Sequence, residues 1–155
     1  MAIYDRSLSA LVGALLAVAM SNGAVFAKDV PPLPEGIVIS QPDASVPANI
    51  ADFIGTWSGI SDPGPTTMTF IVTEVNANGD AKAIYAWAAG EEKGYAGPVE
   101  AKIDGDMLTM PPIFGPAYLL TFQMKSDGTL KFIYGVYGAN KKIVEEYPSI
   151  LHKVN

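Results

Sequence analysis

The chain has 155 residues, 16 acidic and 10 basic side chains, a formal net charge of −6 and no cysteine. A net-acidic chain without a basic cluster argues against nucleic acid as a partner, because that affinity comes from neutralised phosphates. With no Cys and a single histidine, His152, the ligands for a structural zinc or transition-metal site are missing. We therefore predict no metal, no cofactor and no nucleic acid.

The first 27 residues have the pattern of a secretory signal peptide. Arg6 provides a positive charge, an apolar run covers 10–20, and Val25-Phe26-Ala27 precedes the expected cleavage point. The alternative is a membrane anchor, but the run is shorter than the roughly 20 residues that span a bilayer. We predict cleavage after Ala27, export to the periplasm or outside the cell, and no stable membrane insertion afterwards. The absence of disulfides favours a bacterial source.

Residues 28–50 are expected to form an extended tether. Their prolines remove backbone donors and fix φ, and no hydrophobic period is sustained between them. The apolar segment 37–39 could add a strand to a sheet edge, and 48–53 could form one helical turn. The five prolines are Pro31, Pro32, Pro34, Pro42 and Pro47.

Residues 51–155 are predicted to form a single domain made of short strands. Apolar residues alternate with polar ones, and Gly/Asn/Asp turns recur at intervals of roughly ten residues. This rhythm predicts an all-β fold, an antiparallel up-and-down meander of about eight strands that closes into a barrel, because closure removes exposed edges. The expected strands are 54–60, 66–75, 81–88, 98–103, 107–110, 118–124, 130–136 and 142–147.

The segment Phe53-x-Gly55-x-Trp57 resembles the opening of a lipocalin or related calycin barrel. In that family a Gly-x-Trp on the first strand seals the closed end, so the resemblance implies a structural barrel-end role for Gly55 and Trp57. The Gly-Thr-Trp-Ser-Gly opening is also similar to short, uncharacterised bacterial exported domains. The later segments 84–87 and 127–130 fit the same group.

The sequence departs from the lipocalin pattern in two places. It has no Thr-Asp-Tyr turn and no late Arg to stack on Trp57; Lys131, Lys141 or Lys142 could take the place of that Arg. Avidins open similarly but need a polar biotin contact two residues after the Trp, where this chain has Gly59. Biotin is therefore not the expected ligand.

No residue pattern indicates catalysis. The sequence lacks a Gly-x-Ser-x-Gly elbow, and His152 lies three residues from the end, where we expect a loose terminus. The adjacent pairs 91–92 and 145–146 are glutamates whose side chains point to opposite sides of a strand, which favours surface solvation. Asp104 and Asp106 flank a glycine and fit a hairpin turn better than a calcium site. We predict a protein that is not an enzyme, with no catalytic residues.

The inward face of the predicted barrel is rich in aromatic residues. An eight-stranded barrel either is filled by its side chains or holds one small ligand, and aromatic walls with Tyr hydroxyls suit such a pocket. Loop 90–97 is expected to carry Tyr95 as a further ligand contact, and segment 111–116 is a second candidate. The candidate ligand-binding residues are Phe70, Tyr85, Trp87, Tyr118, Phe122, Phe132 and Tyr134.

Three functions fit these observations. The first is an exported, non-catalytic binding module for a small apolar or aromatic molecule. The second is a solid barrel whose outer surface contacts a protein partner or an envelope polymer. The third is a small outer-membrane barrel, although the expected strands 98–103 and 107–110 are shorter than the 9–11 residues of a tilted spanning strand.

Overall fold

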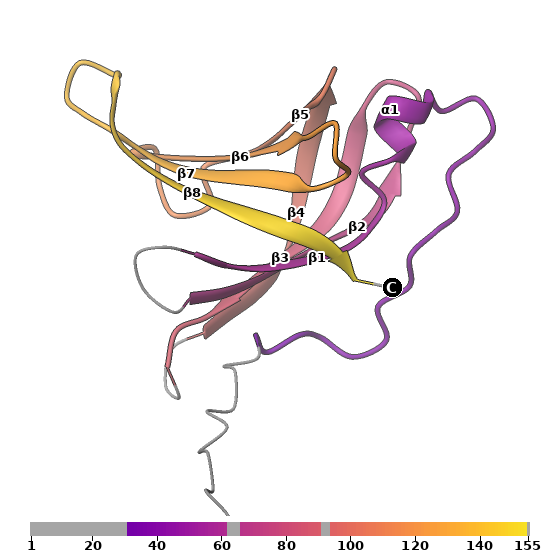
Figure 1. Ribbon diagram of the computed structural model, residues 1–155, viewed down its shortest axis with the longest axis horizontal. Helices are drawn as coiled ribbons and strands as arrows, with labels where there is room; N and C mark the ends of the chain where they lie inside the picture. The colour runs from indigo at the N-terminus through magenta and orange to yellow at the C-terminus, as the bar shows by residue number, and fades with distance from the viewer. Residues whose placement is uncertain (1–30, 62–65, 91–93, 155) are drawn as a thin grey trace, which may run out of the picture.

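The computed structural model describes residues 31–61, 66–90 and 94–154, and they form a closed antiparallel barrel (Figure 1). Each strand pairs with its neighbour along the chain, and β1 also pairs with β8. The predicted all-β, up-and-down barrel is therefore confirmed. Helix α1 (Ala48–Ala51) precedes β1 (Gly55–Ser61), β2 (Thr66–Val75), β3 (Asp80–Ala88), β4 (Gly94–Asp104), β5 (Met107–Met110), β6 (Tyr118–Met124), β7 (Leu130–Tyr137) and β8 (Ile143–Val154).

The two ends of the barrel differ in their connections. At the end beside α1, which we call the closed end, short turns join β2 to β3, β4 to β5 and β6 to β7 (Figure 1). At the opposite, open end lie segment 111–117 between β5 and β6 and segment 138–142 between β7 and β8. The predicted signal peptide, residues 1–27, lies outside the described residues.

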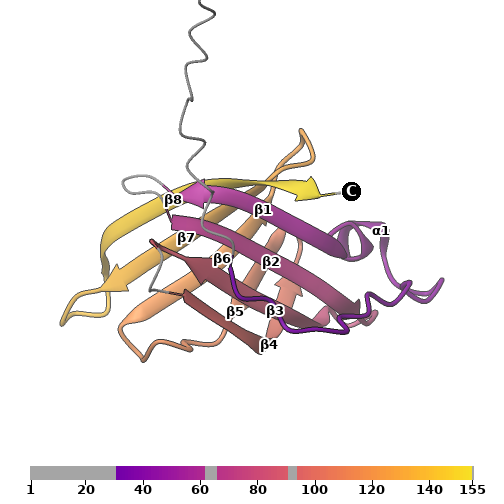
Figure 2. The same ribbon diagram turned by 90° about the horizontal axis from the view of Figure 1, so that it is seen from below.

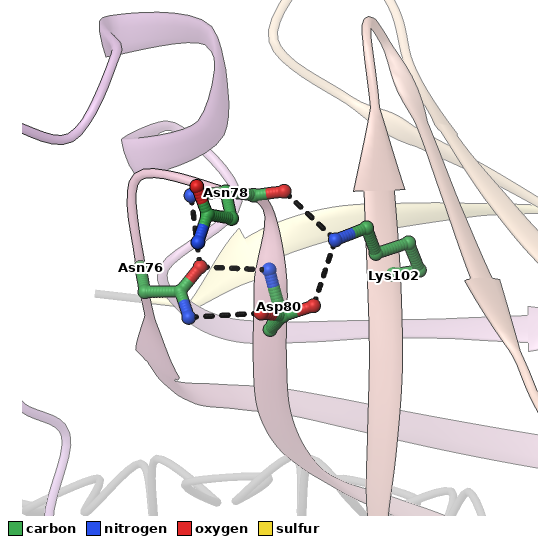
Figure 3. Close-up of polar contacts among 4 residues, drawn as sticks. All are labelled: Asn76, Asn78, Asp80 and Lys102. Carbon is green, nitrogen blue, oxygen red and sulfur yellow. Dashed lines mark hydrogen bonds and ion pairs between the residues drawn. The ribbon is translucent and has the colours of Figure 1, made fainter.

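The turn from β2 to β3 shows how side chains fix a hairpin at the closed end (Figure 3). The Oδ1 atom of Asn76 accepts from the backbone N–H groups of Asn78 (2.9 Å) and Asp80 (3.0 Å). From β4, the Nζ of Lys102 donates to the Asn78 carbonyl (2.9 Å) and to Asp80 Oδ1 (2.7 Å). The predicted turn at 76–79 is thus confirmed, and β4 is tied to it.

The closed half of the barrel is filled by side chains. Phe53, Trp57, Phe70 and Phe122 are 0–2% exposed. The Phe70 and Phe122 rings stack with centroids 3.9 Å apart and planes 12° from parallel. Large inward residues at this end leave no room for a ligand, so this half has the packed interior expected of a small barrel.

Trp57 seals the closed end, with contacts on both its polar edge and its ring face. Its Nε1 donates to the Phe53 carbonyl at 2.8 Å, and the Lys153 ammonium lies 5.1 Å from the ring centroid. Gly55 has φ +127°, and a Cβ there would lie 2.9 Å from Lys153 Cε. The cation over the Trp is therefore Lys153, and the prediction of Lys131, Lys141 or Lys142 was wrong, because β8 continues to Val154.

Two strands are longer than their patterns indicated. β4 begins at Gly94, so 94–97, expected to be loop, pair with β3. β8 runs past Pro148 to Val154, because this part pairs with β1 and buries Leu151. His152 accordingly lies in an ordered strand, opposite Ser58, and not in a loose terminus.

Residues 31–46 cross the outer side of the barrel before reaching α1 (Figure 2). The Ser40 N–H donates to the Thr73 carbonyl of β2 at 2.8 Å. We call residues 31–46 the arm. A Cβ built at Gly94 of β4 would lie 3.1 Å from Pro32 Cδ, so the arm also touches β4. Residues 37–39 form no strand. On the strands that this segment crosses, the outward-facing residues Ile71 and Ala86 are almost fully buried.

Candidate functional site

A cavity of about 340 Å³ opens at the open end of the barrel. Its walls come from β1, β2, β3, β7 and β8 and from the segment between β5 and β6. The volume lies near the lower end of the roughly 300–1,000 Å³ found for small-molecule pockets. The lining residues are Ser61, Thr66, Met68, Tyr85, Trp87, Phe114, Phe132, Tyr134 and Tyr147.

Aromatic rings pack against one another around this cavity. Tyr85 is central: the ring centroids of Phe132 and Phe114 lie 6.0 and 6.1 Å from its own, the latter edge-on. A second group of stacked or tilted rings lies along the rim. The ring centroid of Tyr134 is 5.5 Å from that of Tyr118 and 6.1 Å from that of Tyr147. Such contacts hold the rings in place, so the walls are preorganised for an apolar or aromatic guest.

The cavity tyrosines are held in their neutral form. Burial raises the pKa of Tyr85 far above its ordinary value of 10, and nearby Tyr134 adds to the rise. Burial also raises the pKa of Tyr134, with Tyr118 contributing. For Tyr147, the hydrogen bond to Glu145 (2.8 Å) is the main cause of a raised pKa. At neutral pH these phenols therefore keep their protons, and the Tyr147 hydroxyl already donates its own to Glu145.

The buried Tyr85 predicts a loss of stability at alkaline pH. Below about pH 10 both the folded and the unfolded chain keep the Tyr85 proton, so its burial adds no pH dependence. Above that pH the unfolded chain releases the proton and the folded one retains it. The free energy of unfolding should therefore fall, by at most about 1.4 kcal/mol per pH unit for this residue.

Urea unfolding between about pH 8 and 11 would measure this loss. The Tyr85→Phe variant should show a shallower alkaline decline than the natural protein, by about one proton. Identical slopes in the two proteins would mean that Tyr85 ionises in the folded state.

Four of the seven predicted ligand-binding residues line the cavity: Tyr85, Trp87, Phe132 and Tyr134. Of the others, Phe70 and Phe122 lie in the filled closed half, 0% and 1% exposed. Tyr118 faces inward but reaches the cavity only by packing on Tyr134.

Tyr95 does not lie on a loop, contrary to our prediction. It belongs to β4, pairs with Trp87, and its ring centroid is 6.5 Å from that of Tyr85 and 5.7 Å from that of Phe114. The flanking glycines, read as loop signals, serve close packing. A Cβ at Gly97 would collide with the Tyr95 hydroxyl, so Gly97 makes room for this ring inside the barrel.

Sequence reasoning did not single out five lining residues as ligand contacts: Ser61, Thr66, Met68, Phe114 and Tyr147. Extending the strand alternation through 143–154 would have turned Tyr147 inward, since it shares a face with buried Leu151. Phe114 lies within the candidate segment 111–116, but no periodicity indicates where a loop side chain points.

Phe114 packs beside the part of β4 that lacks a partner strand on one side. β4 pairs with β5 only through Lys102–Asp104, so among the described residues 94–101 have no partner strand on that side. The Phe114 ring packs edge-on against Tyr95 and Tyr85 at the same place, with interplanar angles of 70° and 67°. The ring therefore contacts this part of β4 and also helps to line the cavity.

A larger hollow, about 600 Å³, follows β3, β4 and β5, but its lining is charged. Two ion pairs form among its side chains, Lys82–Glu74 (2.8 Å) and Lys102–Asp80 (2.7 Å). All four side chains are more than half exposed. We regard it as solvated outer surface, and the smaller apolar cavity as the candidate site.

Among the carboxylates considered above, Asp106 and Glu145 have hydrogen-bond partners. Asp106 accepts from Gln123 Nε2 at 2.8 Å, and Gly105 between the two aspartates has φ +61°, as the predicted turn requires. Glu91 and Glu92 lie outside the described residues. In the described ranges, no group of three or more His, Cys, Asp or Glu side chains is placed to hold a metal ion.

A scan against protein-family models and a search of curated proteins found no match to this chain. The lipocalin-like resemblance therefore rests on the residues quoted above. Within the described part of the chain, no helix has the length and hydropathy of a membrane span.

Proposed function

We propose that this protein is an exported, non-catalytic binding module that holds one small apolar or aromatic molecule in its open-end cavity. The observation that carries the proposal is the cavity of about 340 Å³, walled by aromatic rings and bearing tyrosine hydroxyls. The packed closed half gives it a rigid floor. A hollow of this kind, with few polar groups among apolar walls, is typical of small-molecule sites.

One surface feature favours a second candidate, an interaction module for a protein or envelope polymer. Ile60 and Ile150 face outward, are paired across β1 and β8, and are 48% and 45% exposed. Such a contact would use the barrel's outer wall and leave the cavity unused.

The outer surface supports a barrel that works outside the membrane. Glu74, Lys82 and Glu100 lie side by side on the outer face of β2, β3 and β4, where a spanning barrel would present apolar residues to lipid. We keep the expectation of export to the periplasm or beyond, and of no stable membrane insertion after signal cleavage.

Native mass spectrometry of the protein purified gently from the periplasm of an expressing bacterium tests the binding function. We expect an excess mass of a few hundred daltons that is lost on denaturation. Thr66→Trp should remove this mass, because the indole would occupy the cavity mouth. Ser126→Trp, which adds the same ring at an exposed closed-end turn, should keep it.

A bare mass in all samples, together with no binding of added aromatic probes, would refute the cavity proposal. The second candidate would then be tested by changing Ile60 and Ile150 to serine in a pull-down from envelope extracts. Retention of a mass excess by Thr66→Trp would instead place the ligand elsewhere on the protein.

A further inference from the structure

Three hydroxyl side chains form a row on the inner side of the barrel. Thr66 of β2 pairs with Ser61 of β1, and Ser61 pairs with Ser149 of β8. Thr66 and Ser61 line the cavity, whereas the rest of its lining is aromatic apart from Met68. We call Thr66, Ser61 and Ser149 the hydroxyl row. It adds aliphatic hydroxyl groups on one side of a cavity whose other hydroxyls belong to tyrosines.

Ser149 lies at the boundary between the packed core and the cavity. On β8 it shares a face with Tyr147, which lines the cavity, and with Leu151, which is fully buried. Both of its partners across the ladders, Ser61 and Phe132, line the cavity. Ser149 thus lies level with two cavity-lining residues and next to the cavity.

The Ser149 hydroxyl has no hydrogen-bond partner among the described residues. The residue is 6% exposed, and its Oγ is buried. Buried side-chain hydroxyls in folded proteins are nearly always paired, so an unpaired one beside a cavity needs a reason. A polar group on a guest would supply that partner. Met68, next to Thr66 on the same face, lines the cavity with a flexible side chain that can adapt to a guest.

The charge of the cavity lining further restricts the chemical class of guest that can bind. None of the nine described lining residues is charged at neutral pH, and a buried charge without a partner is strongly unfavourable. Hydroxyl side chains both donate and accept hydrogen bonds, which suits an alcohol, phenol or carbonyl oxygen.

We propose, building on the cavity function above, that the ligand is an uncharged aromatic compound with a hydroxyl or carbonyl group on one edge. That group hydrogen-bonds Ser149 at the deep end of the hydroxyl row, and the ring packs against the aromatic wall. Ser149 is therefore the residue that separates oxygenated aromatic compounds from plain hydrocarbons of the same shape.

Two probes of equal shape, 2-naphthol and naphthalene, test this, with binding followed by the fluorescence of Trp87 in the cavity wall. We expect the natural protein to bind 2-naphthol roughly three- to tenfold more tightly than naphthalene, which is the effect of one net hydrogen bond. Ser149→Ala should abolish that preference and leave naphthalene affinity unchanged. Ser126→Ala, in an exposed turn, should keep it. The anion 2-naphthoate should bind more weakly than 2-naphthol.

Thermal melting of the ligand-free variants gives a readout that does not depend on any probe. Loss of an unpaired hydroxyl should leave the melting temperature of Ser149→Ala unchanged or slightly raised, whereas loss of a structural hydrogen bond would lower it. A lowered melting temperature would overturn the assignment, because the hydroxyl would already have a partner.

Failure of this inference is distinguishable from failure of the cavity function. If 2-naphthol and naphthalene bind with equal affinity, the cavity function stands but the role of Ser149 is refuted. The same holds if Ser149→Ala still binds 2-naphthol more tightly than naphthalene. Tighter binding of 2-naphthoate than of 2-naphthol overturns the uncharged class. If no probe binds and no native mass excess exists, both proposals fail together.

Discussion

Replacing Trp57 by alanine should lower the free energy of unfolding by about 3–5 kcal/mol, the usual effect of truncating a buried Trp. The side chain is 2% exposed and packs at the closed end against a core that includes Phe53 and Phe70. The substitution also leaves the Phe53 carbonyl without the indole N–H that donates to it at 2.8 Å. Urea unfolding of the natural and variant proteins measures the loss.

Two controls separate the parts of this effect. Lys153→Met keeps an apolar stem over the Trp57 ring but removes the ammonium 5.1 Å from its centroid, so we expect a loss of only about 0.5–1 kcal/mol. Trp87→Ala, at a half-exposed position in the cavity wall, should destabilise less than Trp57→Ala. An unfolding midpoint for Trp57→Ala equal to that of the natural protein would contradict the sealing role.

The strands and their order followed from local information in the sequence. Alternation placed Met68, Phe70 and Val72 on one face of β2, and turn residues such as Asn76 and Gly79 marked where the chain reverses. These signals extend over only a few residues, so they can be recognised without knowing which strand is the partner. Closure then followed because a meander of this length would otherwise leave two edges unpaired.

Features decided by distant contacts could not be predicted in this way. β8 continues through Pro148 because β1 is available to pair with its second half, and Lys153 consequently reaches Trp57. Gly94 and Gly97 resemble loop residues in the sequence, yet they lie in β4. A Cβ at Gly94 would be tight against Pro32 (3.1 Å), and one at Gly97 would collide with the Tyr95 hydroxyl. A glycine marks missing side-chain volume, and only the fold shows what uses that volume.

The pattern of inward-facing residues likewise could not predict whether the barrel is filled or contains a cavity. Phe70 and Tyr85 both point inward from neighbouring strands and are paired residues. Phe70 stacks on Phe122 in the filled half, while Tyr85 lies at the cavity. The difference depends on summed side-chain volume and on the local width between opposite strands, which no single strand encodes.

The Phe114→Ala variant should exchange its ligand faster than the natural protein. The Phe114 ring makes edge contacts with Tyr85 and Tyr95 beside the part of β4 that has no partner strand on that side. Two aromatic contacts of about 0.5–1.5 kcal/mol each would have to break for a guest to pass. The two contacts total about 1–3 kcal/mol, so we expect 2-naphthol to dissociate roughly 5- to 150-fold faster from the variant.

Stopped-flow measurements of Trp87 fluorescence with 2-naphthol give both rate constants. Removal of a side chain that blocks the entrance should raise the association and the dissociation rates together, since both directions use the same opening. A rise in the dissociation rate alone would mean that Phe114 contacts the bound ligand but does not block its entry. Unchanged rates would place the entrance elsewhere at the open end.

Phe132→Ala is the matched control. It also removes a phenyl ring, but from a strand, whereas Phe114 lies in a loop. Phe132 is 2% exposed and belongs to the core, so its truncation should cost about 3–5 kcal/mol of unfolding free energy. Phe114 is half-buried and its truncation should cost much less. If Phe114→Ala proved as destabilising as Phe132→Ala, the 111–117 segment would be part of the folding core, and its ring could not act as a movable cover.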